Sequence, residues 1–308
     1  MEYNEVLVSV IIPVFNAENY IVASLQSILS QTHKNLEIVV IDDGSTDNTK
    51  SIISSYDDDR IVFRSRPNKG LISTLNECID LSNGAFIARM DADDIAHLDR
   101  IKSQVNFLEK NTDTGVLFTG FEYIDADDKV FNKNVPTTDY MLESVELLFG
   151  CPVCHPTAMF DMRKLKKSDI YYNESYKNAE DFELWTRLIG ITQVGILQGP
   201  LLQYRIHSGS ITSQNNIKQN ATAVRAIKSN LLTALPRATE DSIETVYNNT
   251  ESRYSFTATF KALFLLFWFL KKLNPTFSRV KYVKKSVRLL KLKIELSSKK
   301  NVKLRQDL

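Results

Sequence analysis

Three carboxylates stand close together in the segment Asp91-Ala92-Asp93-Asp94. They follow the apolar run 85–90, which we expect to form a buried strand. Carboxylates placed this closely repel one another and raise one another's pKa values unless a cation lies between them. Mg²⁺ and Mn²⁺ prefer such hard oxygen ligands and commonly bridge to the phosphates of a substrate. The segment therefore predicts a divalent metal site. The alternative is a solvated acidic turn in which one Asp caps a helix.

Two further acidic pairs could also do chemistry. Asp42-Asp43 precedes Gly44-Ser45 and follows a second apolar run, 36–41, so one carboxylate could accept hydrogen bonds from a base N–H or from ribose hydroxyls. The alternative is an ordinary turn, since Asp-Gly is a common turn signal. Glu180-Asp181 stands at the start of a predicted helix and could supply a general base with a tuned pKa. The alternative here is that the helix dipole simply favours acids at this end.

An alternation of strands and helices must position these acids. The predicted strands are 6–15, 36–41, 60–65 and 85–90, and the predicted helices between them are 17–31 and 71–81. This alternation implies right-handed crossovers and an open, doubly wound, mostly parallel sheet. Ligands of such sheets bind beyond the carboxyl ends of the strands. Three of these ends carry polar groups, namely Asn16, Asp42-Asp43 and Asp91–Asp94.

The order of these segments resembles the family 2 glycosyltransferases, which have the GT-A fold. The similar segments, in the order of the family, are Val8–Glu18, Ser27–Thr32, Ile41–Asp47, Ile87–Asp94, Glu180–Trp185 and Tyr204–His207 followed by Ser210. The resemblance covers residues 5 to 215 and implies an α/β fold with helices flanking the sheet. It also implies an inverting, metal-dependent transfer of a sugar from a nucleotide-sugar donor to an acceptor hydroxyl.

The resemblance assigns roles to individual residues. Asp181, with Glu180 beside it, becomes the general base, and Asp93 holds the metal ion against the donor diphosphate. His207 either adds a second ligand to the ion or is a structural histidine. The residues assigned to the donor are Pro13, Phe15, Glu18, Asp42, Asp43, Asn68, Lys69, Asp91 and Ala92. Phe15 would flank the base, Asp43 would accept a hydrogen bond from it, and Asp91 would contact ribose or sugar.

One base and one ion, Mn²⁺ or Mg²⁺, suffice for this reaction. Displacement at the anomeric carbon passes through an oxocarbenium-like state, and an inverting reaction needs a base opposite the leaving group. The metal ion stabilises the departing diphosphate, so no general acid is required. We expect a UDP-sugar donor carrying a hexose or N-acetylhexosamine. The expected acceptor is a glycan or lipid-linked glycan in surface polysaccharide, O-antigen or capsule assembly.

The sequence departs from the family at Leu75, where many relatives carry Arg before Asn76. Lys69 or Arg89 could supply the missing positive charge. Cys151 and Cys154 form one CxxC pair next to His155, and without a second pair this is weak support for zinc. We expect buried free thiols there, and we expect His155-Pro156-Thr157 near the acceptor, as in relatives.

The charge of the chain is divided unevenly. From Arg253 to the end there are 15 Lys and Arg but two acids, so this part carries +13 and the remainder −12, for the total of +1. We expect a catalytic domain at 1–235, with a nucleotide-binding half at 1–110 and an acceptor half at 111–235. Residues 236–308 are expected to form a basic, amphipathic helical extension that binds an anionic membrane surface. The alternatives are a helix packed on the domain and RNA binding, and we expect no nucleic-acid partner because no recognisable module accompanies the charge. The sequence is also compatible with a homo-oligomer.

The sequence also indicates a compartment. Three cysteines, an odd number, and a polar N-terminus without a signal peptide favour a reducing environment. The most apolar window, 262–270, is far shorter than the roughly 20 residues that a membrane-spanning helix needs. We therefore expect a cytoplasmic protein, peripheral on the inner face of the cell membrane.

Three rival functions are less consistent with the sequence. A nucleotidyltransferase needs a Gly-rich loop after its first strand, and a dinucleotide-dependent dehydrogenase needs G-x-G-x-x-G there. Residues 13–18 contain no glycine. A non-catalytic protein of the same fold would lose the acids, whereas Asp91, Asp93 and Asp181 are all present.

Overall fold

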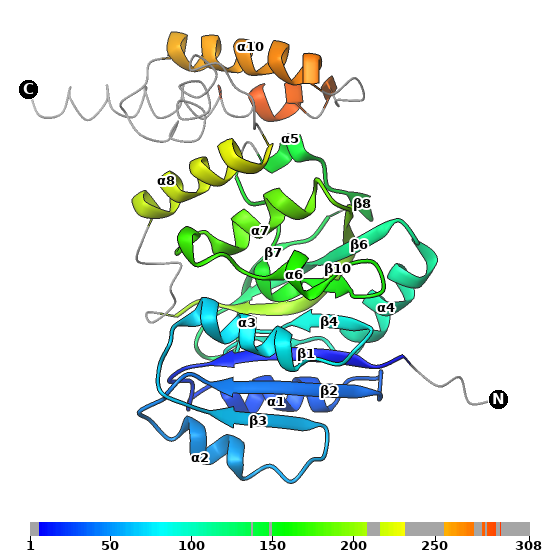
Figure 1. Ribbon diagram of the computed structural model, residues 1–308, viewed down its shortest axis with the longest axis vertical. Helices are drawn as coiled ribbons and strands as arrows, with labels where there is room; N and C mark the ends of the chain where they lie inside the picture. The colour runs from blue at the N-terminus through cyan, green and yellow to red at the C-terminus, as the bar shows by residue number, and fades with distance from the viewer. Residues whose placement is uncertain are drawn as a thin grey trace, which may run out of the picture. The chain divides into compact units, whose positions relative to one another are not determined.

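The computed structural model describes residues 6–136, 138–147, 150–207, 216–231, 256–273, 279–280, 282–287 and 290 (Figure 1). The chain forms two compact units. The first lies within Met1–Leu142 and Val153–Gln214, and the second within Glu143–Pro152 and Asn215–Leu308. The longer segment of the second unit begins at residue 215, whereas the sequence predicts a domain boundary after residue 235.

Four parallel strands form the first half of the sheet in the order β3-β2-β1-β4. Their bounds are β1 Val8–Val14, β2 Leu36–Asp42, β3 Ile61–Ser65 and β4 Phe86–Arg89. Figure 1 shows β1, β2 and β3 side by side and pointing the same way. Val14 pairs with Asp42, so the residues that follow these two strands lie at one edge of the sheet. All seven residues of β1 are buried, as a strand covered on both faces requires.

Helices cover both faces of this half. They are α1 Ile21–Leu29, α2 Thr49–Ser54, α3 Leu71–Leu81 and α4 Arg100–Lys110. Alternate strand residues such as Ile12 and Val40 pack in one core with Leu25 of α1 and Ile101 of α4. The helix α3 packs against β1 and β2 without belonging to that core, so it covers the opposite face (Figure 1). The doubly wound α/β architecture expected from the sequence is therefore confirmed.

The second half of the sheet is mixed. Its strands are β5 Ile95–Ala96, β6 Thr114–Ile124, β7 Val130–Asn134, β8 Tyr140–Met141, β9 Met159–Asp161 and β10 Gln193–Arg205. The short β9 runs antiparallel to both β4 and β6, whereas β10 runs parallel to β6. The full order is β3-β2-β1-β4-β9-β6-β10-β5, with β7 on β6 and β8 on β10. Parallel pairing thus dominates only where strands and helices alternate regularly in sequence.

The part of the first unit between residues 155 and 188 adds short helical elements. These are the 3-10 helices η1 His155–Thr157 and η2 Glu174–Tyr176 and the helices α6 Lys167–Ile170 and α7 Glu180–Leu188. Three acids lie in the first turn of α7, where the helix dipole favours them. The ring of Trp185 on α7 is 4.7 Å from that of Phe118 and 6.1 Å from that of Phe160. This packing fixes α7 on the sheet and so determines where its first turn lies.

The second unit contains α5 Ser144–Leu147, α8 Asn216–Ala226, a π-helical turn Ile227–Leu231 and α10 Phe256–Leu273. The helix α10 buries Ala262, Leu263 and Leu266. The hydroxyl of Tyr282 donates to the carbonyl of Leu263 at 2.5 Å. None of the helices in the described ranges is long and apolar enough to span a bilayer.

Candidate active site

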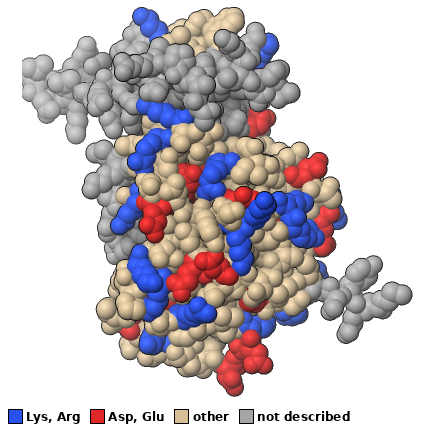
Figure 2. Space-filling model, viewed as in Figure 1, with Lys and Arg blue, Asp and Glu red and all other residues tan. Residues whose placement is uncertain are grey.

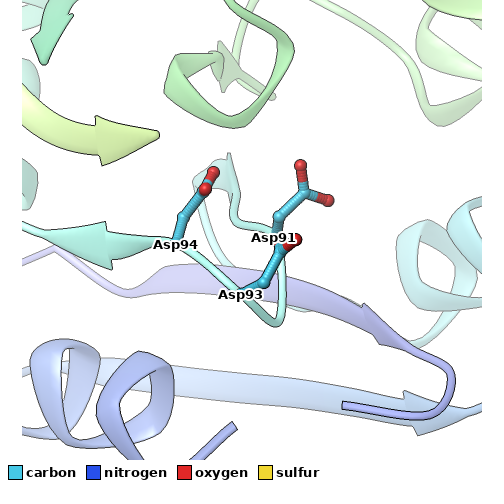
Figure 3. Close-up of side chains that lie close together, drawn as sticks. All are labelled: Asp91, Asp93 and Asp94. Atoms are coloured by element: carbon cyan, nitrogen blue, oxygen red, sulfur yellow. The ribbon is translucent and has the colours of Figure 1, made fainter. Parts of the chain in front are cut away.

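The three carboxylates of Asp91, Asp93 and Asp94 come together on the loop between β4 and β5 (Figure 3). Each contributes an oxygen, and these oxygens lie within 4.8 Å of one another. The side chain of Asp91 is 25% exposed and that of Asp93 30%, whereas Asp94 is buried. The loop therefore offers a partly open face with a buried carboxylate behind it.

Asp94 is the least satisfied of the three. Its Oδ1 accepts from the backbone N–H of Arg205 at 2.9 Å, but its buried Oδ2 has no hydrogen-bond partner among the described residues. Burial and the charges of Asp91 and Asp93 raise the pKa of Asp94 well above its usual range. An orphaned carboxylate oxygen beside two other carboxylates fits a hard divalent cation. The residues present thus match the ion that the sequence predicts.

The end of β10 brings His207 to this loop. His207 Nε2 lies 3.1 Å from Asp93 Oδ2, and its ring centroid lies 4.9 Å from that of Tyr20. The buried Arg205 organises this arrangement, since its Nε donates to the Asp93 carbonyl at 2.7 Å and its Nη1 to the Asp125 carbonyl at 2.8 Å. Two residues predicted as metal ligands, Asp93 and His207, are therefore adjacent although they lie far apart in the sequence.

Asp91 faces a different partner. Both of its carboxylate oxygens bind the guanidinium of Arg89, the last residue of β4. Arg89 is only 3% exposed, and its positive charge lowers the pKa of Asp181 against the larger effect of burial. Arg89 is thus a cation within the site, where the sequence leaves open whether it or Lys69 supplies one.

The acids of α7 lie within the same electrostatic environment. Asp181 Oδ1 accepts from the N–H of Phe182 at 2.7 Å. Burial raises the pKa of Asp181, and burial together with the Asp181 charge raises the pKa of Glu180. A carboxyl group with a raised pKa is suited to accept a proton near neutral pH.

A buried network supports this side of the site. His155 Nε2 lies 2.6 Å from the hydroxyl of Tyr172, and burial lowers the pKa of His155 well below its usual range. The side chain of Asn76 on α3 binds both the N–H and the carbonyl of Tyr172, at 2.8 and 3.0 Å. The neighbouring Leu75 is fully buried in the core, so an apolar residue suits its position.

Asp42 and Asp43 are buried and well bonded. Asp42 accepts from the N–H of Ser45 at 3.0 Å and from the hydroxyl of Ser65 at 2.8 Å. Asp43 accepts from the N–H groups of Lys69 and Gly70 at 2.8 and 2.9 Å. The guanidinium of Arg66 also binds Asp43. These carboxylates shape the loop 66–70 that follows β3.

The remaining residues assigned to the donor surround this edge of the sheet. Phe15 follows β1 and is 51% exposed, while Pro13 is buried within β1. Glu18 accepts from the N–H and the side-chain amide of Asn48, at 3.0 and 2.9 Å. Two residues of the loop 66–70, Asn68 and Lys69, are exposed, and Ala92 is 8% exposed within the acidic loop.

Sequence reasoning missed the partners that hold these loops. Arg66 binds Asp43, Glu77 and Thr74 together, and Asn16, with φ of 49°, accepts from the N–H of Thr46 at 2.8 Å. Arg205 appears in a family-like segment, but its role as an organiser is visible only in the structure. One sequence signal could have pointed to such residues. A charged residue within an apolar segment, such as Arg89 at the end of a buried strand, indicates a buried charge that needs a partner.

The cysteines do not form a metal site in the described part of the chain. Cys78, Cys151 and Cys154 are not joined in disulfides, and the group of His, Cys, Asp or Glu side chains that converges in the described residues is the acidic loop. Cys78 is buried, but Cys151 is exposed and Cys154 partly buried. The expectation of buried thiols in the CxxC pair is therefore wrong for Cys151, because the segment around it lies at the surface.

Several known proteins have sequences similar to this chain. A family model described as Glycosyl transferase family 2 matches residues 9–168. The chain is 33% identical over 236 residues to an uncharacterized glycosyltransferase of Haemophilus influenzae, which covers 73% of each chain. It is 35% identical over 188 residues to the putative glycosyltransferase EpsE of Bacillus subtilis, covering 58% of this chain and 66% of EpsE. A chondroitin synthase of Escherichia coli is 31% identical over 184 residues, which are 59% of this chain and 26% of that protein.

Solved structures share the fold. Residues 1–349 of S. aureus TarS, in complex with UDP-GlcNAc, superpose with a TM-score of 0.64 at 22% identity, covering 94% of this chain and 81% of TarS. The mannosyltransferase PcManGT of Pyrobaculum calidifontis, in complex with GDP-Man and Mn²⁺, gives a TM-score of 0.52 at 16% identity, covering 95% of this chain and 86% of PcManGT. At these identities the likeness establishes the GT-A fold and nothing finer.

Proposed function

This chain belongs to glycosyltransferase family 2, and we propose that it is an inverting, metal-dependent enzyme that transfers a sugar from a nucleotide sugar to an acceptor hydroxyl. The observation that carries the proposal is the buried Asp94 oxygen that lacks a partner among the described residues, within a loop of three carboxylates. That loop follows β4, at the carboxyl edge of a doubly wound sheet, where ligands bind.

Mn²⁺ or Mg²⁺ is the ion that we propose for this loop. Asp93 and Asp94 would hold it, with His207 next to Asp93 as a further ligand. When bound, the ion neutralises the negative charge that develops on the departing diphosphate. The chain's own contribution is to gather the carboxylates, which Arg205 does through its bonds to Asp93 and Asp94.

For the donor we propose a UDP-sugar with a hexose or N-acetylhexosamine. The likeness to TarS, whose structure contains UDP-GlcNAc, supports UDP, and GDP is the alternative suggested by PcManGT. The exposed ring of Phe15 is available to stack on the base, beside Glu18 and the loop that Asp43 holds. Pro13, Asp42, Asn68, Lys69 and Ala92 complete the proposed donor pocket.

Asp181 is the proposed general base. Its carboxylate takes the proton of the acceptor hydroxyl while the acceptor oxygen bonds to the anomeric carbon and the bond from that carbon to the diphosphate breaks. The raised pKa of Asp181 makes the carboxylate a stronger base, and the adjacent Glu180 adds negative charge. The acceptor is proposed to be a glycan or lipid-linked glycan of a surface polysaccharide, which the likeness to EpsE and to a chondroitin synthase supports.

Donor hydrolysis tests this function without a known acceptor. A panel of nucleotide sugars is incubated with wild type, Asp93→Ala and Asp181→Asn, each with Mn²⁺, Mg²⁺ or EDTA. We expect slow, metal-dependent release of one nucleoside diphosphate by wild type and none by Asp93→Ala. If no nucleotide sugar binds or turns over with either metal, the chain is not a transferase of this kind.

We further propose that the second unit contacts an anionic membrane at the inner face of the cell membrane. Its helix α10 exposes Phe260, Phe264 and Trp268 while it buries its opposite side. On the face of the first unit shown in Figure 2, basic and acidic side chains are interspersed, so the described residues there form no large field of one sign. The excess of Lys and Arg from residue 253 onwards favours anionic lipid.

Vesicle sedimentation tests the membrane contact. The side chains of Phe264 and Trp268, with ring centroids 6.3 Å apart, form one exposed patch on α10. We expect the double change Phe264→Glu with Trp268→Glu to weaken binding to vesicles with anionic phosphatidylglycerol by about tenfold or more, equivalent to about 1.4 kcal/mol. The matched control is Phe131→Glu, an equally exposed aromatic of β7 in the first unit. Equal binding by all three proteins would contradict the contact.

A further inference from the structure

Arg89 and Asp91 form a two-point contact at the centre of the site. One terminal nitrogen of the guanidinium binds Oδ2 of Asp91 and the other binds Oδ1. This parallel pairing is the strongest geometry available to an arginine and a carboxylate, and it fixes the orientation of both groups. Asp93 and Asp94, on the same loop, have no such contact with Arg89 among the described residues.

Arg89 is a costly residue at its position. It ends a strand whose other residues, Phe86, Ile87 and Ala88, are apolar and buried. The arginine itself is 3% exposed, and its buried Nε has no hydrogen-bond partner within the described part of the chain. Burying a charge with an unsatisfied donor destabilises a fold, and an apolar residue of similar volume would often be at least as stable. Arg89 therefore contributes little to the stability of the fold, and we look for its role in the function of the site.

The contact constrains what Asp91 can do. A carboxylate offers about four lone-pair sites, and the guanidinium takes one on each oxygen. One acceptor site on each oxygen is left, in a fixed direction, on a side chain that is 25% exposed. Asp91 can thus accept hydrogen bonds from a sugar or ribose hydroxyl. One of its oxygens lies within 4.8 Å of oxygens of Asp93 and Asp94, but the guanidinium occupies one site on each Asp91 oxygen, so the carboxylate cannot turn both oxygens toward an ion held by those two residues.

We propose that Arg89 is a positioning residue that holds Asp91 as an oriented hydrogen-bond acceptor for the donor and keeps it from serving as a ligand of the metal ion. The inference rests on the proposed function, because it assigns Asp91 to the donor and leaves the ion to Asp93 and Asp94. The family resemblance already implies that Asp91 contacts the donor and Asp93 the ion. The new element is Arg89, a residue outside the acidic loop, which fixes the orientation of Asp91.

Lysine is the informative replacement for Arg89. It keeps the positive charge but cannot form the planar, two-point contact. If the site needs only a buried charge, Arg89→Lys retains activity. If the orientation of Asp91 matters, Arg89→Lys loses activity although the charge is conserved. Asp91→Asn removes one acceptor oxygen but keeps the shape and one bond to the guanidinium.

A double-mutant cycle on the full chain measures the coupling. We expect Arg89→Lys and Asp91→Asn each to lower the kcat for nucleoside diphosphate release from the donor by about 100-fold, because small misplacements cost that much. The double variant should lose no more than Asp91→Asn alone, since the two residues act as one unit. Independent losses that multiply to about 10⁴-fold, or full activity of Arg89→Lys, would overturn the proposal. Thermal unfolding of each variant checks that it is folded.

Binding of Mn²⁺ alone, followed by the loss of the free-ion EPR signal, provides a test that needs no turnover. We expect Arg89→Lys and Asp91→Asn to bind Mn²⁺ within about twofold of wild type, and Asp93→Asn to bind it at least about tenfold more weakly. If Asp91→Asn weakens Mn²⁺ as much as Asp93→Asn does, Asp91 is a metal ligand and the proposal fails. A wild type that binds Mn²⁺ but turns over no nucleotide sugar would instead count against the proposed function.

Discussion

Two aspartate pairs stand at the carboxyl ends of β2 and β4, the strands on either side of β1, and their surroundings differ. Asp42 and Asp43, at the end of β2, are buried, and their oxygens accept hydrogen bonds from backbone amides and from the side chains of Ser65 and Arg66. Asp93 and Asp94, after β4, lie beside a third carboxylate, and one Asp94 oxygen lacks a partner among the described residues. The hydrogen bonds of the fold satisfy the first pair, whereas the second keeps an unpartnered oxygen beside other carboxylates, where we propose that a cation binds.

The difference shows that the same sequence signal can serve two purposes. Two acids at the end of a buried strand indicate a ligand-binding edge in both places. At β2, however, the loop 66–70 returns its amides and a guanidinium to the carboxylates. At β4 the guanidinium of Arg89 binds Asp91 and not Asp93 or Asp94. In the proposed site the first pair therefore shapes the donor pocket, and the second is available to bind the ion.

The largest effect that separates the pairs is on turnover. Asp93→Asn should lower metal-dependent donor hydrolysis by about 1000-fold or more, because several kcal/mol of charge stabilisation are lost at 1.36 kcal/mol per tenfold. The thermal unfolding midpoint should stay within a few degrees of wild type. Turnover within about tenfold of wild type would show that Asp93 is not essential to the ion.

Asp181 on α7, the proposed general base, extends the comparison to a carboxylate outside the two pairs. Asp181→Asn should lower kcat by about 10²- to 10⁴-fold with little change in donor KM, as expected for loss of a general base. Because the pKa of Asp181 is raised, the wild-type rate should fall as the pH drops through that raised value and the base becomes protonated. A pH profile of wild type that stays flat below neutrality would argue against this role.

At the first pair we expect a substitution to lower the stability of the fold, whereas Asp93→Asn in the second pair lowers turnover and leaves stability nearly unchanged. Asp43→Asn leaves Arg66 without its buried anion and should cost about 3 kcal/mol, since breaking a buried pair costs about 3–5 kcal/mol. The unfolding midpoint should fall by about 6–12 °C at about 2–4 °C per kcal/mol. Calorimetry of the metal-free protein measures this, with Asp59→Asn, in the loop before β3, as a surface control. No change in the midpoint would mean that Asp43 is not structural.

The smallest expected effect is a gain in stability. Asp94→Asn should stabilise the metal-free protein at pH 7 by about 1 kcal/mol, because it removes a buried charge with an orphaned oxygen. The folded-state pKa of Asp94 is raised above its unfolded value, so the ionised carboxylate weakens the fold at high pH. This penalty shrinks as the pH falls below the folded-state pKa and is lost once the pH is below the unfolded pKa. The advantage of the variant should therefore shrink on acidification. Destabilisation by Asp94→Asn without metal would contradict the account.

The comparison also shows what the sequence could predict. The strands of the first half and the helix 71–81, which agrees with α3 at both ends, follow from regular apolar periodicity. The family-like segment Tyr204–His207 includes only the last two residues of the thirteen-residue β10. The two-residue strands β5 and β8 and the exposed β7 were not predicted, because such short or exposed segments carry little periodic signal.

At the site, residue types were predictable but pairings were not. The acidic motifs identified the edge of the sheet and the family. The bonds of Arg66 to Asp43 and of Arg205 to the loop of Asp93 join residues 23 and 112 positions apart. Such partners are set by tertiary packing, so no local pattern marks them. His207 was predicted near the metal only through the resemblance, and the structure places it beside Asp93.

The most direct test of the central claim is the location of the ion. Crystals of the full chain grown with Mn²⁺ and UDP would be measured for anomalous scattering at the manganese edge. We predict one peak in coordination contact with the Asp93 carboxylate, next to the diphosphate and away from Asp42 and Asp43. A peak at the first pair, or UDP bound in the pocket without an ion at the acidic loop, would contradict the account.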